Sequence, residues 1–303
     1  MGILFILVPL FSLMAISLLR HNRMTTNFTF AWLSALALLQ VALVIILPSS
    51  FWSSPTPFFN FDLFADSLSR VVLLSIGIVV LVSLLAAEYL IKEADRKFYF
   101  YNILLVMLSG MNGIVLVKDI FSLYVYLEVT SIASFIIIAL KKERDGLEGA
   151  FKYIIFSAIA TVLLLTAIAL TLLLTGETTF AGIANSLKTV GHNPVILLAL
   201  GLYLVALFIK SGLIPFHGWL PDAYSASTSS VSILLAGVVT KTVGVYPLIR
   251  IVYSVIGFDG PVKNILLLVG AVSIVIGALA AIGQTDFKRM LAYSSISQVG
   301  YIV

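Results

Sequence analysis

The stretch LFIKSGLIPFHGWLPDAY, residues 207–224, places a lysine near the end of an apolar run and follows it with helix-breaking residues. Ser211, Gly212 and Pro215 come directly after Lys210, and glycine and proline interrupt or kink a helix. Backbone that leaves the helical conformation at membrane depth is tolerated only inside protein or beside a hydrated cavity. If the flanking chain spans a membrane, the stretch predicts a broken helix with a charged side chain at the break.

The composition of the whole chain indicates an integral membrane protein. Of its 303 residues, 61% are hydrophobic and 11% are charged, and the mean hydropathy is +1.14. Soluble domains are about 45–50% apolar and about 25% charged. A helix needs about 20 apolar residues to cross the hydrocarbon core. The segments that qualify are residues 2–19, 28–48, 69–91, 98–117, 119–140, 150–174, 194–214, 228–253, 262–283 and 286–303. We therefore predict an all-α membrane protein with about ten transmembrane helices. The least marked boundary between two spans is at Lys118-Asp119.

The lysines and arginines divide unequally between the two sides of these spans. One side holds Arg20, Arg23, Lys92, Arg96, Lys97, Lys141, Lys142, Arg144, Lys152, Lys288 and Arg289. The other holds Arg70, Lys118, Lys188, Arg250 and Lys263. Because cytoplasmic loops carry the excess of positive charge, the richer side is predicted to be cytoplasmic and the N-terminus to lie outside. This distribution explains the net charge of +4 without a nucleic-acid partner.

The inventory of metal-binding side chains argues against redox chemistry in this chain. It contains no cysteine, which excludes disulfides, thiolate zinc sites and cysteine-ligated iron–sulfur clusters. Its three histidines, His21, His192 and His217, are far apart and fall at or outside predicted membrane boundaries. A bis-histidine haem within the membrane is therefore not expected, and no cofactor is predicted. Electrons of any associated redox reaction would travel in a partner.

Three charged residues fall inside predicted spans and are not placed at either membrane surface: Glu128, Lys210 and Lys241. Glu128 lies about 13 Å from one end of its span, near the bilayer midplane. A charge at a helix centre costs about 2.5–3.5 kcal/mol on insertion scales, and such residues usually mark ion or proton pathways. A Glu–Lys pair whose separation changes could load and release a proton. The alternatives are a pair that only fixes packing and a Lys210 that snorkels to water. Lys241 lies too deep in its span to snorkel.

Weaker candidates surround these charges. His217, Lys152 and Asp222 are candidate relay or uptake residues, and Trp219 between two prolines is interpreted as an anchor at the membrane interface. Hydroxyl groups near the charges could hold water or relay protons, although in membrane helices they more often bond backbone or neighbouring helices. These are Tyr124, Tyr126, Thr130, Ser131, Ser229, Ser230, Thr240 and Thr242.

Five motifs together resemble one family. Residues 207–224, VSILLAGVVTKTVGVYPLIR at 231–250, YVYLEVTSIASF at 124–135, Phe151-Lys152-Tyr153 and QTDFKRMLAYSSISQVGYI at 284–302 are similar to the antiporter-like membrane subunits of respiratory complex I. The same family includes Mrp cation/proton antiporters and energy-converting membrane-bound hydrogenases. The resemblance covers most of residues 99–303, whereas residues 1–98 agree only in their number of spans.

The resemblance implies a fold with two inverted five-helix repeats, each with a broken helix. Residues 1–98 would then form three N-terminal helices, residues 99–253 the first repeat with its break near 210–215, and residues 254–303 the start of an incomplete second repeat. Glu128, Lys210 and Lys241 match the family's charged positions for ion translocation. The implied partners are other membrane subunits, including a neighbouring antiporter-like subunit, lipid and, indirectly, peripheral redox subunits with iron–sulfur clusters.

From these observations we expect a subunit that translocates protons or exchanges Na⁺ for H⁺. It would belong to a multisubunit redox-driven pump or an Mrp-type antiporter in a prokaryotic cytoplasmic membrane. A half-length or truncated member is expected, since the chain ends while its tenth span is still apolar. Two alternatives stay open. The chain could be a non-conducting scaffold that docks other subunits, or a stand-alone transporter for an organic solute.

Overall fold

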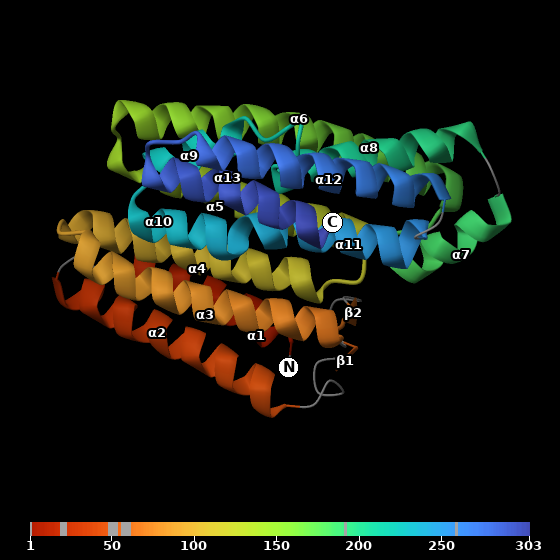
Figure 1. Cartoon of the computed structure of the whole chain (residues 1–303). Coiled ribbons are helices and arrows are strands. Elements are labelled where there is room, and N and C mark those ends of the chain that lie inside the picture. Colours follow the sequence, from red (N-terminus) through yellow and green to blue (C-terminus); the bar gives the residue numbers. More distant parts are fainter. Residues whose placement is uncertain (1, 19–22, 48–53, 56–61, 191–192, 258–259) are drawn as a thin grey trace.

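A computed structural model describes residues 2–18, 23–47, 54–55, 62–190, 193–257 and 260–303. Long helices lie side by side in a bundle (Figure 1). The α-helices are α1 Leu4–Ser17, α2 Arg23–Ile46, α3 Ser67–Leu90, α4 Ala94–Leu116, α5 Ile120–Ile138, α6 Arg144–Thr175, α7 Phe180–Val190, α8 Pro194–Ser211, α9 Trp219–Ala226, α10 Ser229–Leu234, α11 Tyr246–Ile251, α12 Gly260–Ile282 and α13 Phe287–Ile302. The other elements are the 3₁₀ turn η2 Ala139–Lys141, the π-helical turns η3 Leu235–Val239, η4 Lys241–Val245 and η5 Val252–Ile256, and the two-residue strands β1 Ser54–Pro55 and β2 Asp62–Leu63.

The predicted all-α membrane architecture is confirmed. Among the described residues, eight helices are long and apolar enough to cross a membrane, the seventh being the continuous helix Ser229–Ile256. The first and last of the ten predicted spans correspond to α1 and α13, which have 14 and 16 residues. The sequence did not predict the short helices α7 and α9. The chain is therefore a multi-pass membrane protein built almost wholly from helices.

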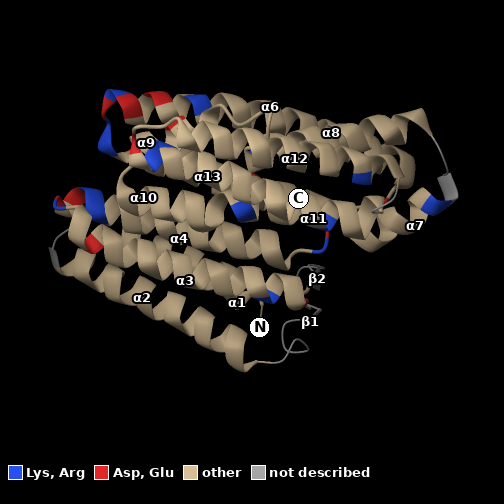
Figure 2. Cartoon of the chain, in the orientation of Figure 1, with Lys and Arg blue, Asp and Glu red and all other residues tan. Residues whose placement is uncertain are grey.

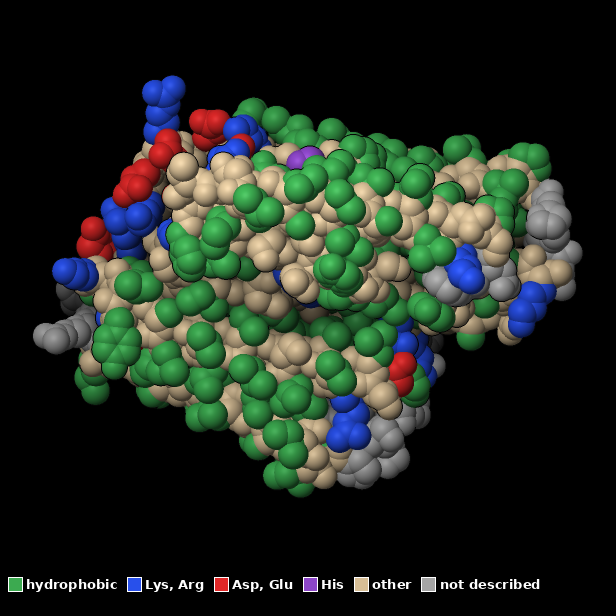
Figure 3. All heavy atoms as spheres, viewed as in Figure 1, with side chains coloured by type: hydrophobic (Ala, Val, Ile, Leu, Met, Phe, Trp, Pro, Cys, Tyr) green, Lys and Arg blue, Asp and Glu red, His purple; other side chains and the backbone are tan. Residues whose placement is uncertain are grey.

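Charged side chains gather at the ends of the bundle (Figure 2), and its lateral face is largely hydrophobic (Figure 3). This is the distribution that a bilayer requires, with apolar side chains towards lipid and charges at the two surfaces. Arg20, His21 and His192, which entered the sequence analysis, lie outside the described residues, as does the side chain of Arg23. The orientation with the N-terminus outside stays a prediction.

Polar caps set where several helices begin. The side chains of Asp66, Asp119, Asn193 and Asp286 accept hydrogen bonds from backbone N–H groups in the first turns of α3, α5, α8 and α13. Such bonds satisfy donors that have no partner within the helix. The boundary predicted at Lys118-Asp119 is confirmed, because α4 ends at Leu116 and the Asp119 cap starts α5.

The helix α4 lies at the centre of the bundle's core, and every residue from Met107 to Leu116 is buried. Gly110 and Gly113 allow close packing with α5, because a Cβ on either would collide with Thr130 or Tyr126. This contact holds α5 at the level of Glu128.

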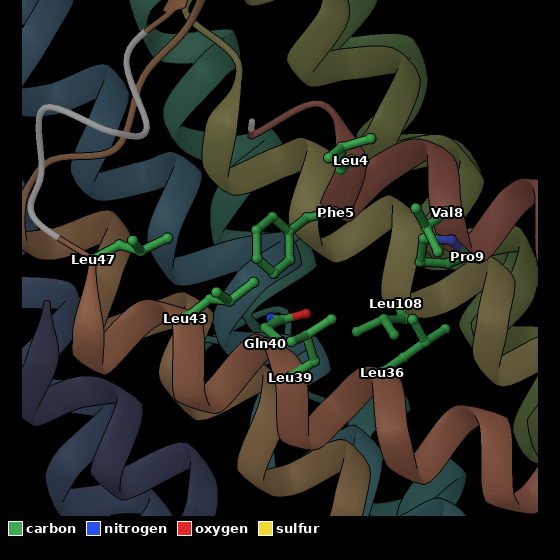
Figure 4. A pocket seen from close by; sticks show the side chains of 10 residues that line it. All are labelled: Leu4, Phe5, Val8, Pro9, Leu36, Leu39, Gln40, Leu43, Leu47 and Leu108. Atoms are coloured by element: carbon green, nitrogen blue, oxygen red, sulfur yellow. The ribbon is translucent and has the colours of Figure 1, made fainter.

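The first two helices both lie near α4 but leave a cleft between them (Figure 4). The cleft measures about 300 Å³ and has an almost wholly apolar lining that includes Phe5, Pro9 and Leu39. Its one polar side chain, Gln40, exchanges hydrogen bonds of 3.0 Å with Asn112 of α4. The amide of Gln40 also donates to the Leu73 carbonyl at 2.9 Å, so its polar atoms are already used by the fold.

Candidate functional site

Glu128 and Lys210 form an ion pair inside the helix bundle. Nζ of Lys210 lies 3.0 Å from Oε1 of Glu128, and the two side chains are 2% and 23% exposed. The sequence placed both residues within the membrane but left open whether they touch, because they lie on different helices. The structure brings α5 and α8 together at this pair. The attraction between the charges is strong here because few water molecules can reach them.

Hydroxyl groups complete the surroundings of the pair. Lys210 Nζ also donates to Ser131 Oγ at 3.2 Å and to Ser157 Oγ at 3.4 Å, so all three donors of its ammonium group have acceptors. Thr161 Oγ1 donates to Glu128 Oε1 at 2.7 Å. Ser157 and Thr161 were missed by the sequence analysis. Their spacing of four residues, which puts both on one face of α6, is the signal that could have found them.

The helix that carries Lys210 ends one residue later. Gly212 takes a left-handed conformation with φ of 67°, and the Leu213 N–H bonds to the Phe208 carbonyl at 3.1 Å, as in a glycine-terminated helix. The chain becomes helical again at Trp219, the first residue of α9. The backbone at the break is satisfied by side chains, since Trp219 Nε1 donates to the Ile209 carbonyl at 3.1 Å and the Ile214 N–H to Ser273 Oγ at 3.1 Å.

The assignment of Trp219 to the membrane interface was wrong. Its side chain is buried, with 3% exposed, and its ring packs edge-on against Tyr153 of α6, with centroids 4.7 Å apart. An aromatic residue between two prolines resembles an interfacial anchor in sequence. Here α9 folds back into the bundle, and the indole serves to hold the broken end of α8.

Lys241 lies on the helix that crosses the end of α8. A Cβ on Gly244 would lie 2.4 Å from the Cα of Ser211, so glycine is needed for the two backbones to approach. Lys241 Nζ donates to the Ala236 carbonyl and to Ser295 Oγ of α13 at 2.8 Å. No carboxylate pairs with Lys241 among the residues that the structure describes. The π-helical turn at Lys241–Val245 is a feature that is frequent at functional sites.

Lys152 and Asp222 meet at one end of the bundle. Asp222 Oδ2 lies 2.6 Å from Lys152 Nζ, and its Oδ1 lies 2.7 Å from Arg289 of α13. Lys152 also pairs with Glu148 at 2.7 Å. The cluster borders a polar cavity of about 500 Å³ that Asp145 and Asp286 also line. The structure therefore joins two of the predicted relay residues and adds Arg289, which the sequence analysis counted only among the cations of the richer side.

His217 lies apart from both groups, in the non-helical segment between α8 and α9. Its ring faces Tyr293 of α13, with centroids 6.1 Å apart. Nδ1 is buried and has no hydrogen-bond partner among the described residues. His217 contacts neither the Glu128–Lys210 pair nor the Asp222 cluster through any described hydrogen bond or ion pair.

Three of the eight hydroxyl groups proposed as relays bond the backbone instead. Thr130, Thr240 and Thr242 donate to carbonyls of their own helices, those of Tyr126, Leu235 and Val238. This is the structural alternative that the sequence analysis left open. Ser131 differs, because it accepts a hydrogen bond from Lys210.

A second ion pair, which is partly buried and which the sequence analysis missed, lies at the end of the bundle opposite the Asp222 cluster. Arg250 holds Asp66 through two hydrogen bonds, of 2.7 Å and 2.6 Å. Burial acts to raise the pKa of Asp66, but the Arg250 hydrogen bonds and the Ser69 N–H lower it to about 2. These residues are 184 positions apart in the chain, and nothing in the sequence pattern pairs them.

No group of three or more His, Cys, Asp or Glu side chains in the described part of the chain has the arrangement of a metal site. Three sets of charged side chains follow the length of the bundle instead: the Asp222 cluster, the Glu128–Lys210 pair with nearby Lys241, and the Asp66–Arg250 pair. These sets place titratable groups at several depths of the bundle.

Comparison with known proteins identifies the family. Residues 117–303 match the transmembrane family described as NADH:quinone oxidoreductase/Mrp antiporter. NADH-quinone oxidoreductase subunit N of Desulforudis audaxviator is 35% identical, over 99% of this chain and 62% of the relative. A Na⁺/H⁺ antiporter subunit of Alkalihalophilus pseudofirmus is 32% identical, over 86% of this chain and 52% of the relative.

A solved structure shares the fold. A chain of the membrane-bound sulfane sulfur reductase, an archaeal respiratory membrane complex, superimposes with a TM-score of 0.85 at 25% identity, over 99% of this chain and 63% of that one. The chain thus spans between about half and two thirds of the length of these relatives. All three are parts of multisubunit membrane assemblies by name. The family match and the fold together show that this chain belongs to the NADH:quinone oxidoreductase/Mrp antiporter membrane family.

Proposed function

We propose that the chain translocates protons, or exchanges Na⁺ for H⁺, as an antiporter-like subunit of a multisubunit redox-driven pump or an Mrp-type antiporter. The observation that carries the proposal is the Glu128–Lys210 ion pair at the broken end of α8. A charge pair inside a membrane is retained at a cost in free energy, and ion pathways are its usual use. Subunits of both kinds of complex are among the relatives.

The geometry suggests how the pair works. While Glu128 is ionised, it holds Lys210 against α5 and α6. When a proton reaches Glu128, this attraction is lost and Lys210 can turn towards the helix that carries Lys241, which crosses α8 at the Ser211–Gly244 contact. Lys210 would then give its proton to the Lys241 amine, once Lys241 has released its own proton, and Lys210 would be reprotonated by Glu128.

Proton uptake is assigned to the Asp222 cluster. Asp222 and Lys152 lie beside a polar cavity, on helices that also border the buried pair: Lys152 shares α6 with Ser157 and Thr161. His217, whose buried Nδ1 has no hydrogen-bond partner in the part of the chain that the structure describes, is a second group that could accept a proton. The richer set of lysines and arginines lies at this end, which we assign to the cytoplasm, with the N-terminus outside.

The proposed setting is a prokaryotic cytoplasmic membrane. The partners would be other membrane subunits, among them a neighbouring antiporter-like subunit, together with bilayer lipid. Iron–sulfur subunits would act indirectly, through the membrane partners. Moving one charge against the membrane potential requires about 2.3 kcal/mol per 100 mV. That requirement favours several coupled sites along an axis over one exposed ion pair, which contributes about 1 kcal/mol or less.

The test uses membrane vesicles that contain the intact complex. Redox-driven or Na⁺-driven proton movement is compared in the wild type, Lys210→Met and Lys241→Met, with Lys188→Met on α7 as an exposed control. Assembly is checked by co-purification. We expect both substitutions of buried lysines to abolish proton movement in assembled complexes and the control to have no effect. Unchanged proton movement in both would show instead that the chain is a scaffold and that the lysines serve assembly.

A further inference from the structure

A second large groove lies on the bundle's side, away from the charged axis. It measures about 830 Å³ and is bounded by the first turns of α4, the last turns of α5 and the first half of α6. Its body is apolar: Tyr99, Ile136 and Phe151 line it and are 60%, 45% and 61% exposed. The lateral face of a membrane-spanning bundle is apolar throughout, so what distinguishes these side chains is the groove that they line.

The mouth of the groove is charged. Glu93, Asp95, Arg96 and Lys142 all line it, so two carboxylates and two cations face the same opening. Arg96 Nε bonds Glu93 Oε2 at 2.9 Å, which leaves the other nitrogens of the guanidinium as donors. The side chain of Lys142 is exposed and has no ion-pair partner among the described residues. The opening therefore offers both donors and acceptors, with no net charge.

The groove runs along the helices, from this charged mouth into the apolar part of the bundle. From Arg96 to Ile103 on α4 and from Leu147 to Ile154 on α6, it extends about 10 Å at 1.5 Å per residue. That is about a third of the roughly 30 Å hydrocarbon core. The shape matches one leaflet's lipid, with a polar headgroup at the membrane surface and the first part of its acyl chains below.

The composition of the mouth selects among lipids. A phosphate alone would meet two carboxylates as well as two cations, and a choline group has no N–H to donate. An ethanolamine headgroup carries both a phosphate, for Lys142 and Arg96, and an ammonium group, for Asp95 and Glu93. The α1–α2 cleft (Figure 4) offers no such choice, because its only polar side chain, Gln40, is engaged within the fold.

We propose that the α4–α5–α6 groove is a specific binding site for an aminophospholipid of the phosphatidylethanolamine type. Its phosphate contacts Lys142 and Arg96, its ammonium group contacts Asp95 and Glu93, and its acyl chains lie over Tyr99, Ile136 and Phe151. The lipid would hold together the ends of three helices, two of which carry Glu128, Ser157 and Thr161. The proposal stands apart from the proposed ion transport, because lipid binding is measured without it.

The experiment is native mass spectrometry of the purified full chain released from nanodiscs of stated composition. The probes are phosphatidylethanolamine, phosphatidylcholine and phosphatidylglycerol with identical acyl chains. We expect one phosphatidylethanolamine to be retained per chain and little of the other two. Lys142→Gln should reduce its occupancy about tenfold, the value of one charge-assisted hydrogen bond. Lys188→Gln, an exposed lysine on α7, is the matched control and should retain the lipid.

A second variant tests the apolar part of the site. Ile136→Trp places a larger side chain in the groove at an exposed position, and the thermal melting temperature of each variant shows that it has folded. Loss of phosphatidylethanolamine in a folded Ile136→Trp chain supports the site. Equal retention of the three lipids, a preference for phosphatidylglycerol, or no retained lipid would each overturn the proposal. Protection of Phe151 by a partner subunit in the intact complex, with no lipid present, would also overturn it.

Discussion

Replacing Glu128 by glutamine should destabilise the folded chain strongly, and replacing Lys210 as well should recover part of the loss. Glu128→Gln leaves the Lys210 ammonium, with only 2% of its side chain exposed, without its negative partner. Breaking a buried ion pair in this way costs about 3–5 kcal/mol. The lower end applies here, because Ser131 and Ser157 still accept from the lysine and the glutamine oxygen can take the place of the carboxylate.

Lys210→Met should cost less, because Glu128 is 23% exposed and keeps its hydrogen bond from Thr161. In the double variant Glu128→Gln/Lys210→Met no buried charge is left unpaired. Its loss should therefore be smaller than the sum of the single losses by about 2 kcal/mol, within the range for residues in direct contact. Glu177→Gln, an exposed glutamate in the loop after α6, is the control and should have little effect.

The assay is reversible unfolding of the purified full chain in mixed micelles of detergent and dodecyl sulfate, followed by circular dichroism. All four variants are measured at one pH at which wild-type Glu128 and Lys210 pair. Additive losses in the double variant would refute the reasoning, since they would show that the two charges do not interact in the folded protein. A negligible effect of Glu128→Gln alone would refute the claim that the lysine is buried with a single anionic partner.

Three further predictions concern other parts of the chain. Gly244→Ala should lower the free energy of unfolding by about 1–3 kcal/mol, the usual cost of overpacking, because the new Cβ would collide with Ser211. Gly201→Ala is the control and should have no such effect, because a Cβ there meets nothing within 4 Å. Thermal melting distinguishes the two variants, and equal effects would argue against the helix crossing. The Asp66 ion pair should add stability that is fully present above the ordinary carboxyl pKa of 3.8 and is lost as the pH falls through about 2. When the free energy of unfolding is measured against pH, the curves of the wild type and Asp66→Asn should converge there. Parallel curves would contradict the prediction. Asp222→Asn should slow proton uptake in vesicles and have a smaller effect on stability, because it removes the carboxylate that links α6, α9 and α13 beside the cavity. Normal proton uptake in this variant would exclude the Asp222 cluster from the proton path.

The sequence predicted the spans and the broken helix because both depend on local chemistry. Apolar runs of membrane-spanning length determine the spans, and Gly212 with Pro215 ends α8 where the residues indicate. In the sequence, the boundary at Lys118-Asp119 is marked only by two polar residues. The structure shows that Asp119 caps the N-terminus of α5.

What the sequence did not predict depends on contacts between distant segments. Asp66 and Arg250 are brought together only by the packing of α3 against the helix that contains α11. Trp219 was misplaced because its environment is decided by where α9 folds, and a short helix of eight residues leaves little periodicity to interpret. The contact between Glu128 and Lys210 was left open for the same reason, although both residues were identified.

The packing of α1 on α4 has a consequence for how the protein is made. Ser109 Oγ donates to the carbonyl of Ile6 at 2.8 Å, and these residues are 103 positions apart in the chain. A ribosome adds about 5–20 residues per second, so α4 leaves it about 5–20 seconds after α1. During that interval the first helix resides in the bilayer or the insertion machinery before its own docking surface exists. The helix α1 is therefore synthesised before its docking surface, and it cannot settle into its final place until α4 has entered the membrane.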